Sequence, residues 1–189
     1  MADRAVQYYN EGVSFAQLGQ YAEAVDSCDK AIAIKPDFYE AWFNRGNALA
    51  QLGRHAEALA SHDKAIAINP NDAGAWYNRG VSLYKIGRDA EAVASYDKAL
   101  AIKPDHAEAW CFRGFALYYL GRYTISLASY DKAIAINPND AIAWYNRGVS
   151  LYKLGRHAEA VASYDKAIAI NPDYAGAWEA REIAVQQQK

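Results

Sequence analysis

Histidine and cysteine are the side chains of this sequence whose chemistry would suit metal binding or nucleophilic catalysis, and their spacing favours neither. The four histidines lack the close, repeated spacing of metal ligands, although His55 and His62 lie seven residues apart. Cys111 has no histidine near it in the sequence that would activate it as a nucleophile. No glycine-rich loop of the kind that holds phosphate is present. We therefore expect no metal, no cofactor and no catalytic residue.

Asparagine forms a more informative pattern, because several asparagines recur at one interval. Asn44 and Asn78 lie 34 residues apart, Asn10 precedes them by the same interval, and Asn146 follows at twice that interval. A primary amide carries both a donor and an acceptor, which matches the peptide group of an extended chain. Such a row can bind a polypeptide if the fold brings the amides to one face. Otherwise the amides only solvate the scaffold.

The same interval of 34 residues recurs along nearly the whole chain. Tryptophan, proline and one set of glycines each occur five times at this spacing, at Trp42, Trp76, Trp110, Trp144 and Trp178, at Pro36, Pro70, Pro104, Pro138 and Pro172, and at Gly19, Gly53, Gly87, Gly121 and Gly155. A fixed period of this size indicates stacked repeats rather than a domain built around one catalytic pocket. Such a chain presents a long surface, which suits holding another molecule.

Each repeat predicts two helices, as residues 73–106 illustrate. Apolar residues recur at helical spacing over residues 73–86 and again over residues 90–102. Gly87, between the two segments, can take the left-handed conformation that follows a helix end. Pro104 stops the second helix, because proline disfavours helical geometry in the residue before it.

Small and polar residues indicate how the two helices begin and cross. Asp72 is a favourable N-cap for the first helix of its repeat, and Asp140 has the same place two repeats later. Gly80 and Ala92 are small where the helices are expected to cross closely. One helix pair cannot bury its apolar stripes alone, so neighbouring pairs must stack.

These residues resemble the tetratricopeptide repeat (TPR) family, and the matching positions in the third repeat are Trp76, Gly80, Ala92, Tyr96, Ala99 and Pro104. The sequence departs from the family pattern at Arg79, where leucine is usual. Arginine recurs at this place, and aspartate recurs on the second helix, so we expect an Arg–Asp pair between elements. The residues concerned are Arg45, Arg79, Arg113 and Arg147, with Asp29, Asp63, Asp97, Asp131 and Asp165.

The resemblance implies an all-α fold, a right-handed superhelical solenoid of antiparallel helix pairs. It covers nearly the whole chain, so we expect a single domain over residues 1–189, with repeats at 5–38, 39–72, 73–106, 107–140 and 141–174. Residues 175–189 begin like a further first helix, but Glu182 replaces the close-contact glycine. We expect a solvating capping helix there. The alternative is a segment of a longer array.

The resemblance also implies a concave face, made by the first helix of each repeat, on which a protein segment binds. Some superhelical members of the family hold peptide backbones with a ladder of asparagines. The residues expected to bind a peptide on this face are Asn10, Asn44, Asn78, Asn146, Tyr77, Tyr145, Tyr84, Tyr152, Lys85, Lys153, Phe112, Phe115 and Tyr119. Five helices packed ~8–10 Å apart span roughly 40 Å, which about a dozen extended residues would cover.

Repeat four differs from the others. Phe112 interrupts the asparagine row, and Phe115 stands where other repeats have valine or asparagine. Residues 123–126 are expected in the turn between its two helices. There Ile125 replaces a solvent-facing glutamate, which makes it a candidate for self-association. Drift in one copy of the repeat is the alternative.

The sequence therefore predicts a non-enzymatic protein–protein interaction scaffold that binds an extended peptide, similar to bacterial members of the family. The alternative is a self-assembling homo-oligomeric scaffold that uses repeat four or end-to-end contacts. A third possibility is capture of chaperone C-termini by the family's carboxylate clamp. It is disfavoured, because Tyr9, Val13 and Gly74 occupy places where that clamp needs lysine, asparagine or another basic residue.

Composition narrows the partner and the compartment. A formal net charge of −2 at pH 7 gives no support for a nucleic-acid partner or an anionic membrane surface. No apolar run approaches the ~18 residues that span a bilayer, and the first residues lack a secretory pattern. Cys28 and Cys111 do not form a disulfide pattern, which favours a reducing compartment. We expect a cytoplasmic protein with a protein or peptide partner.

Overall fold

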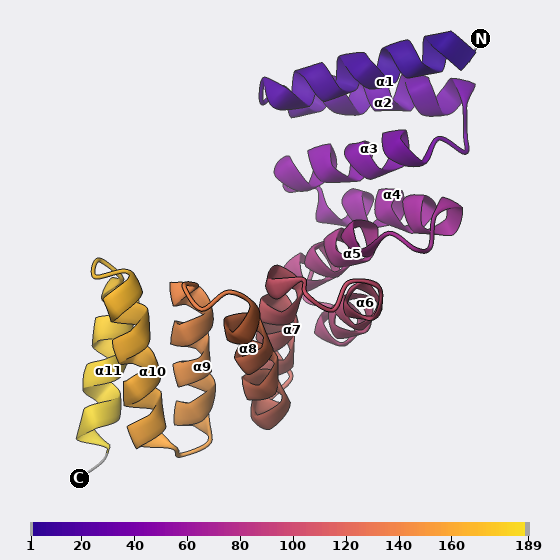
Figure 1. The fold of residues 1–189 in the computed structure, drawn as a ribbon. Helices are drawn as coiled ribbons and strands as arrows, with labels where there is room; N and C mark the ends of the chain where they lie inside the picture. Colours follow the sequence, from indigo (N-terminus) through magenta and orange to yellow (C-terminus); the bar gives the residue numbers. More distant parts are fainter. Residues whose placement is uncertain (1, 188–189) are drawn as a thin grey trace. The chain divides into compact units, whose positions relative to one another are not determined.

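The computed structural model describes residues 2–187, with side chains from residue 4 onward, and this part of the chain forms eleven α-helices and no strand (Figure 1). The helices are α1 (Ala2–Gln17), α2 (Tyr21–Ile34), α3 (Tyr39–Gln51), α4 (His55–Ile68), α5 (Ala73–Lys85), α6 (Asp89–Ile102), α7 (Ala107–Tyr119), α8 (Tyr123–Ile136), α9 (Ala141–Lys153), α10 (His157–Ile170) and α11 (Ala175–Gln186). Odd-numbered helices are the A helices of their repeats, and even-numbered helices are the B helices.

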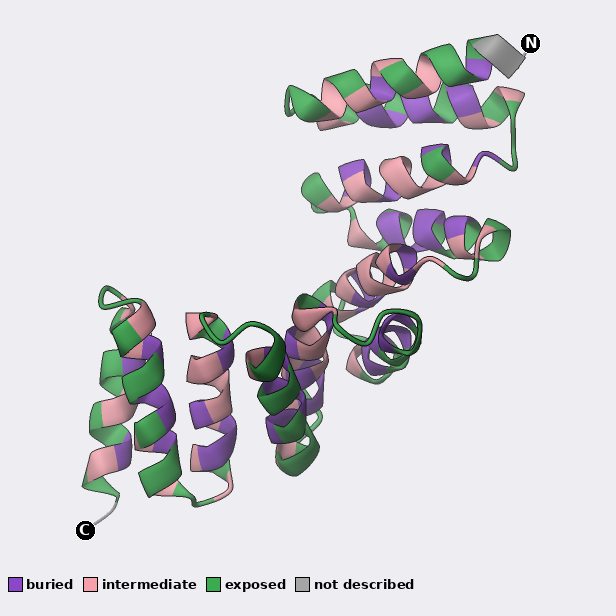
Figure 2. Cartoon of the chain, viewed as in Figure 1, coloured by how far each residue is buried: buried purple, intermediate pink, exposed green. Residues whose placement is uncertain are grey.

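The chain divides into two compact units, unit 1 (Met1–Ile102) with α1–α6 and unit 2 (Lys103–Lys189) with α7–α11. Within each unit every helix packs against the next helix in the chain, and the buried residues lie where the helices meet (Figure 2). This arrangement confirms the expected all-α solenoid of helix pairs. Residues 175–186, where a capping helix was expected, form α11, and residues 188 and 189 lie outside the described part of the chain.

A hydrogen bond explains why tryptophan and proline share one spacing. The indole N–H of Trp76 donates to the carbonyl oxygen of Pro70, six residues earlier, at 2.9 Å. Pro70 follows the end of the preceding B helix, and Trp76 lies in the first turn of the next A helix. The carbonyl oxygen of the proline therefore accepts a hydrogen bond from the helix that follows it. The same bond forms at Trp42, Trp110, Trp144 and Trp178. It fixes the connection between successive repeats.

Glycine ends each of the first five A helices. Gly87 has a φ of 75°, and its counterparts in the other four repeats have φ between 71° and 75°. This left-handed conformation disfavours residues with a Cβ, so the chain can turn tightly into helix B. At the start of the A helices, Asp72 accepts bonds from the amides of Gly74 and Ala75, and Asp140 caps α9 in the same way. Both predicted N-caps are confirmed.

A second glycine lets helices A and B cross at an aromatic ring. A Cβ on Gly80 would lie 2.5 Å from the ring of Tyr96, which is fully buried on α6. A Cβ on Gly148 would lie at the same 2.5 Å from the ring of Tyr164. The close crossing predicted at Gly80 is confirmed, and the group that fills the space is the tyrosine ring of helix B.

Arginine joins three helices within a unit. Arg79 of α5 donates from Nε to Asp63 of α4 at 2.6 Å and from Nη1 to Ser95 of α6 at 2.7 Å. Its guanidinium lies 5.8 Å from the ring centroid of Trp76. The same arrangement recurs at Arg45 and Arg147. The predicted Arg–Asp pair is thereby confirmed. Because the aspartates are half exposed, we expect these pairs to orient the helices more than to stabilise them.

Candidate functional site

In unit 1, the expected asparagines lie on successive A helices and two of these helices are joined through their amides. Asn78 of α5 donates from Nδ2 to Oδ1 of Asn47 on α3 at 2.8 Å. Asn44, one turn before Asn47, is half exposed, and its side chain makes no hydrogen bond within the described residues. The two asparagines therefore differ, because the amide of Asn78 contacts the neighbouring A helix and that of Asn44 does not.

A shallow hollow of about 280 Å³ lies next to these amides, between α1 and α3. Its lining carries no formal charge and consists of Val13, Ala16, Gln17, Tyr21, Asn44, Asn47, Ala48 and Gln51. Aliphatic carbons and one aromatic ring supply its apolar part, and four carboxamides supply donors and acceptors. Such a hollow suits an uncharged side chain whose neighbouring peptide groups need hydrogen-bond partners.

The hollow lies beside a residue that is small in the first two repeats, Ala16 and Ala50. Ala16 stands where the third, fourth and fifth repeats have Tyr84, Tyr118 and Tyr152. Tyr152 packs its ring against the imidazole of His157, with 5.0 Å between ring centroids. Tyr118 lies likewise against Tyr123, with 5.3 Å between ring centroids, so in both repeats an aromatic ring occupies the space beside the start of helix B. In repeat one that space stays open.

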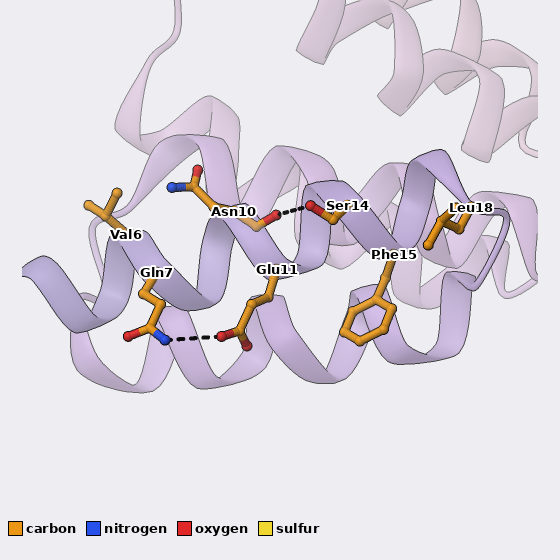
Figure 3. A pocket seen from close by; sticks show the side chains of 7 residues that line it. All are labelled: Val6, Gln7, Asn10, Glu11, Ser14, Phe15 and Leu18. Atoms are coloured by element: carbon orange, nitrogen blue, oxygen red, sulfur yellow. Dashed lines mark hydrogen bonds between the residues drawn. The ribbon is translucent and has the colours of Figure 1, made fainter.

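Asn10 lies at the outer edge of unit 1 rather than in this hollow. With Val6, Gln7, Phe15 and Leu18 it borders a broad depression on the exposed side of α1 (Figure 3). Its backbone carbonyl accepts a bond from the Ser14 hydroxyl at 3.0 Å, as Figure 3 shows. The structure therefore places Asn10 apart from the amide contact between α3 and α5.

The expected tyrosines are partly used in packing. Tyr77 lies 6.0 Å from the buried ring of Tyr96, measured between centroids. The ring of Tyr145 is tilted against those of Tyr164 and Tyr174, with 5.8 and 4.9 Å between ring centroids. Each of the two expected residues is half exposed. They contribute one ring surface to helix packing and keep another accessible. Lys85 and Lys153 are exposed in the last turns of α5 and α9, where a positive charge is favourable.

In unit 2, some of the expected residues contact other residues of the unit, and Tyr119 is largely exposed. Asn146 donates from Nδ2 to the carbonyl oxygen of Ile142 on its own helix at 2.7 Å, so its amide is engaged locally. Phe115 packs edge-on against Tyr130, and the ring centroids of Phe112 and Phe115 are 5.7 Å apart. Tyr119 is far more accessible, with 65% of its surface exposed.

The thiols and the histidines do not gather into a reactive site. Burial raises the pKa of Cys28 to about 11 and that of Cys111 to about 12, so both are neutral thiols at physiological pH. Within residues 2–187, no three side chains of histidine, cysteine, aspartate or glutamate come together as a metal site would need. His62 is fully buried against Gly46 at the place of the repeat's tyrosine.

Sequence reasoning about individual positions missed the hollow itself. Asn47, Gln17 and Gln51 contribute its polar groups, and none of them was among the expected site residues. The available signal was the alanine at residue 16, where tyrosine recurs in three later repeats. A position that is small in the first two repeats thus marks a space that tyrosine fills in the later ones.

Comparisons with known proteins agree with the repeat architecture. Sequence profiles described as tetratricopeptide repeat match residues 73–106 and 113–175, and one described as TPR repeat matches 12–53 and 46–87. A search of curated proteins finds no matching sequence. No helix in the described residues is both long enough and apolar enough to span a bilayer.

Solved structures share the fold at low sequence identity. YrrB, described as a TPR protein with an unusual peptide-binding site, is 24% identical, with a TM-score of 0.84 over 94% of this chain and 92% of that one. MamA is 22% identical, with a TM-score of 0.86 over 93% and 96%. A tetratricopeptide repeat protein from Parabacteroides merdae is 21% identical, with a TM-score of 0.85 over 98% and 74%. The chain belongs to the tetratricopeptide repeat family.

Proposed function

We propose that this protein is a non-enzymatic interaction scaffold that binds an extended peptide on the A helices of unit 1. The observation that carries the proposal is the uncharged hollow between α1 and α3, bordered by the amides of Asn44 and Asn47. A peptide presents alternating donors and acceptors along its backbone and a side chain at every residue. The hollow offers carboxamides for the backbone and an apolar space for one side chain.

The size of this face sets the length of the bound segment. Unit 1 contains three A helices, α1, α3 and α5. At a packing distance of ~8–10 Å per helix they span about 20 Å, which about six extended residues cover at ~3.3–3.6 Å each. The similarity to YrrB supports this proposal through the fold, and the described peptide-binding site is a property of that protein.

Replacing Asn44 and Asn78 together by alanine is expected to weaken peptide binding by about tenfold, since each lost hydrogen bond contributes ~0.5–1.5 kcal/mol. The probe is a peptide selected from a random dodecamer library displayed on phage and measured by calorimetry. Neither side chain belongs to the buried core, so the helical circular dichroism signal is expected to stay unchanged.

Two companion variants sharpen this test. Ala16→Tyr should fill the hollow and lower the affinity for the same dodecamer, because a tyrosine fits at this position in three other repeats. Lys64→Ala, at an exposed position on α4, serves as a matched surface control and should leave affinity unchanged. Failure of the selection to yield any binder, or equal affinities for wild type and both site variants, would reject the proposed face.

A further inference from the structure

An ion pair that closes the start of helix B in three repeats is missing from repeat four. In the complete form, Arg88 forms two hydrogen bonds with Glu91, at 2.7 and 2.6 Å. The same paired bonds join Arg54 to Glu57 and Arg156 to Glu159. Repeat four keeps the arginine, at Arg122, but has Ile125 three residues later. Within the described residues the Arg122 guanidinium therefore lacks the acceptor that its counterparts have.

The surface around Arg122 is also unusually apolar. The structure places residues 123–126 in the first turn of α8, not in the connecting turn expected from the sequence. Ile125 is 47% exposed there, and Tyr119 stands at the end of α7 where the neighbouring repeats have lysine. We call Tyr119, Leu120, Arg122 and Ile125 the turn-four patch. The patch therefore combines one cation, Arg122, with exposed hydrophobic groups. A complementary surface would combine a carboxylate with an apolar hollow.

The α11 helix of this chain offers such a complement. Glu179 and Glu182 are both exposed and have no ion-pair partner within the described residues. Trp178 and Ile183 on the same helix each expose 51% of their surface. A hollow of about 450 Å³ is lined by Trp178, Glu179, Arg181, Glu182, Val185 and Gln186. It combines an indole ring and an aliphatic side chain with two carboxylates and with Arg181, whose guanidinium is paired with Asp165 of α10.

A helix B of the usual kind cannot cover this face of α11. Glu182 stands at the position of Gly80, Gly114 and Gly148. At those glycines a Cβ would come within 2.5–2.7 Å of a tyrosine ring on helix B. A glutamate side chain is much larger than a Cβ, so the usual crossing is blocked at Glu182. The α11 face is therefore suited to a different kind of contact.

We propose that the turn-four patch of one molecule docks onto α11 of a second copy of this chain. Ile125 enters the hollow beside Trp178 of the partner molecule, and Arg122 pairs with the exposed carboxylate of Glu182. The contact joins two different surfaces of unit 2. It is therefore either reciprocal about a two-fold axis, giving a dimer, or repeated head to tail, giving longer assemblies.

A charge exchange tests this contact in the full chain by sedimentation velocity over a range of protein concentrations. The wild-type mass is expected to rise with concentration. Arg122→Glu and Glu182→Arg, each alone, should weaken self-association by about tenfold or more, because each places like charges in contact. Combining the two substitutions in one chain restores opposite charges and should return the assembly to nearly wild-type strength.

The matched control is Arg88→Glu, which reverses an exposed charge at the equivalent position of repeat three and should not change the mass. Ile125→Glu gives Arg122 the internal acceptor that three other repeats provide, so it should also yield monomer. A wild-type chain that stays monomeric at the highest concentration overturns the proposal. So does a double variant as weakly associated as the single variants. Helical circular dichroism confirms that each variant is folded.

Discussion

Replacing Gly80 by alanine is expected to destabilise the protein by about 1–3 kcal/mol, the usual cost of adding volume to a filled core. The new Cβ would lie 2.5 Å from Cε1 of Tyr96, whose ring is fully buried, so the ring or the helix must shift to admit it. Alanine favours a helix interior over glycine by up to ~1 kcal/mol, so the clash must outweigh this gain. Urea unfolding followed by circular dichroism measures the change.

Gly176→Ala is the matched control in α11. There the nearest atom to an added Cβ is 3.6 Å away, an ordinary contact. The substitution should be neutral or stabilise by about 0.4–1 kcal/mol through the unfolded chain. If Gly80→Ala proves as stable as Gly176→Ala, the tyrosine ring does not determine the need for glycine at the crossing.

We expect the free energy of unfolding of the wild-type protein to fall at acid pH because of His62. This imidazole is fully buried, and neither ring nitrogen has a hydrogen-bond partner among the residues that the structure describes. Burial lowers the pKa of His62 from 6.5 to about 4, although Asp63 opposes the shift. Between these two pH values His62 is protonated in the unfolded chain and neutral in the folded chain. The stability contributed by neutral His62 is therefore complete above pH 6.5 and falls by up to about 3 kcal/mol as the pH approaches 4.

His62→Tyr should remove this acid sensitivity, because a tyrosine occupies the equivalent place in the three following repeats and stays neutral in this pH range. The measurement is the difference in unfolding free energy between variant and wild type from pH 7 to pH 4, in which groups common to both proteins cancel. The difference should grow as the pH falls. The reciprocal variant, Tyr164→His, should gain acid sensitivity. A difference that is constant with pH would contradict the assignment to His62.

Much of the fold follows from residues with fixed spacing. Gly87 and Asp72 each act through their own backbone or their nearest neighbours, so their roles are readable from the sequence alone. Trp76 and Pro70 are different. Their shared period is visible in the sequence, but the bond from indole to carbonyl appears only when the turn between the repeats is built. Local chemistry is predictable from a sequence, whereas a contact across a turn needs the geometry.

The candidate site was less predictable for the same reason. The sequence identified Asn44 and Asn78 by their period, yet it could not show that the amide of Asn78 bonds to Asn47 on the neighbouring helix. That bond depends on the offset between α3 and α5. Residues on an A helix also divide between exposed and packed roles, as the partly buried ring of Tyr145 shows. The sequence period predicts which residues share one face of a helix, but it does not predict which residue each side chain contacts.

Site-specific photo-crosslinking tests most directly whether the A helices of unit 1 bind an extended peptide. The photoreactive residue p-benzoylphenylalanine is placed at Gln51, on the border of the hollow, or at Ala60, which is exposed on α4. Each protein is irradiated with the selected dodecamer, and crosslinked fragments are identified by mass spectrometry. We predict crosslinks from residue 51 that excess unlabelled dodecamer suppresses, and none from residue 60. Crosslinks from residue 60 alone would show that the peptide binds the B helices and would contradict the proposed function.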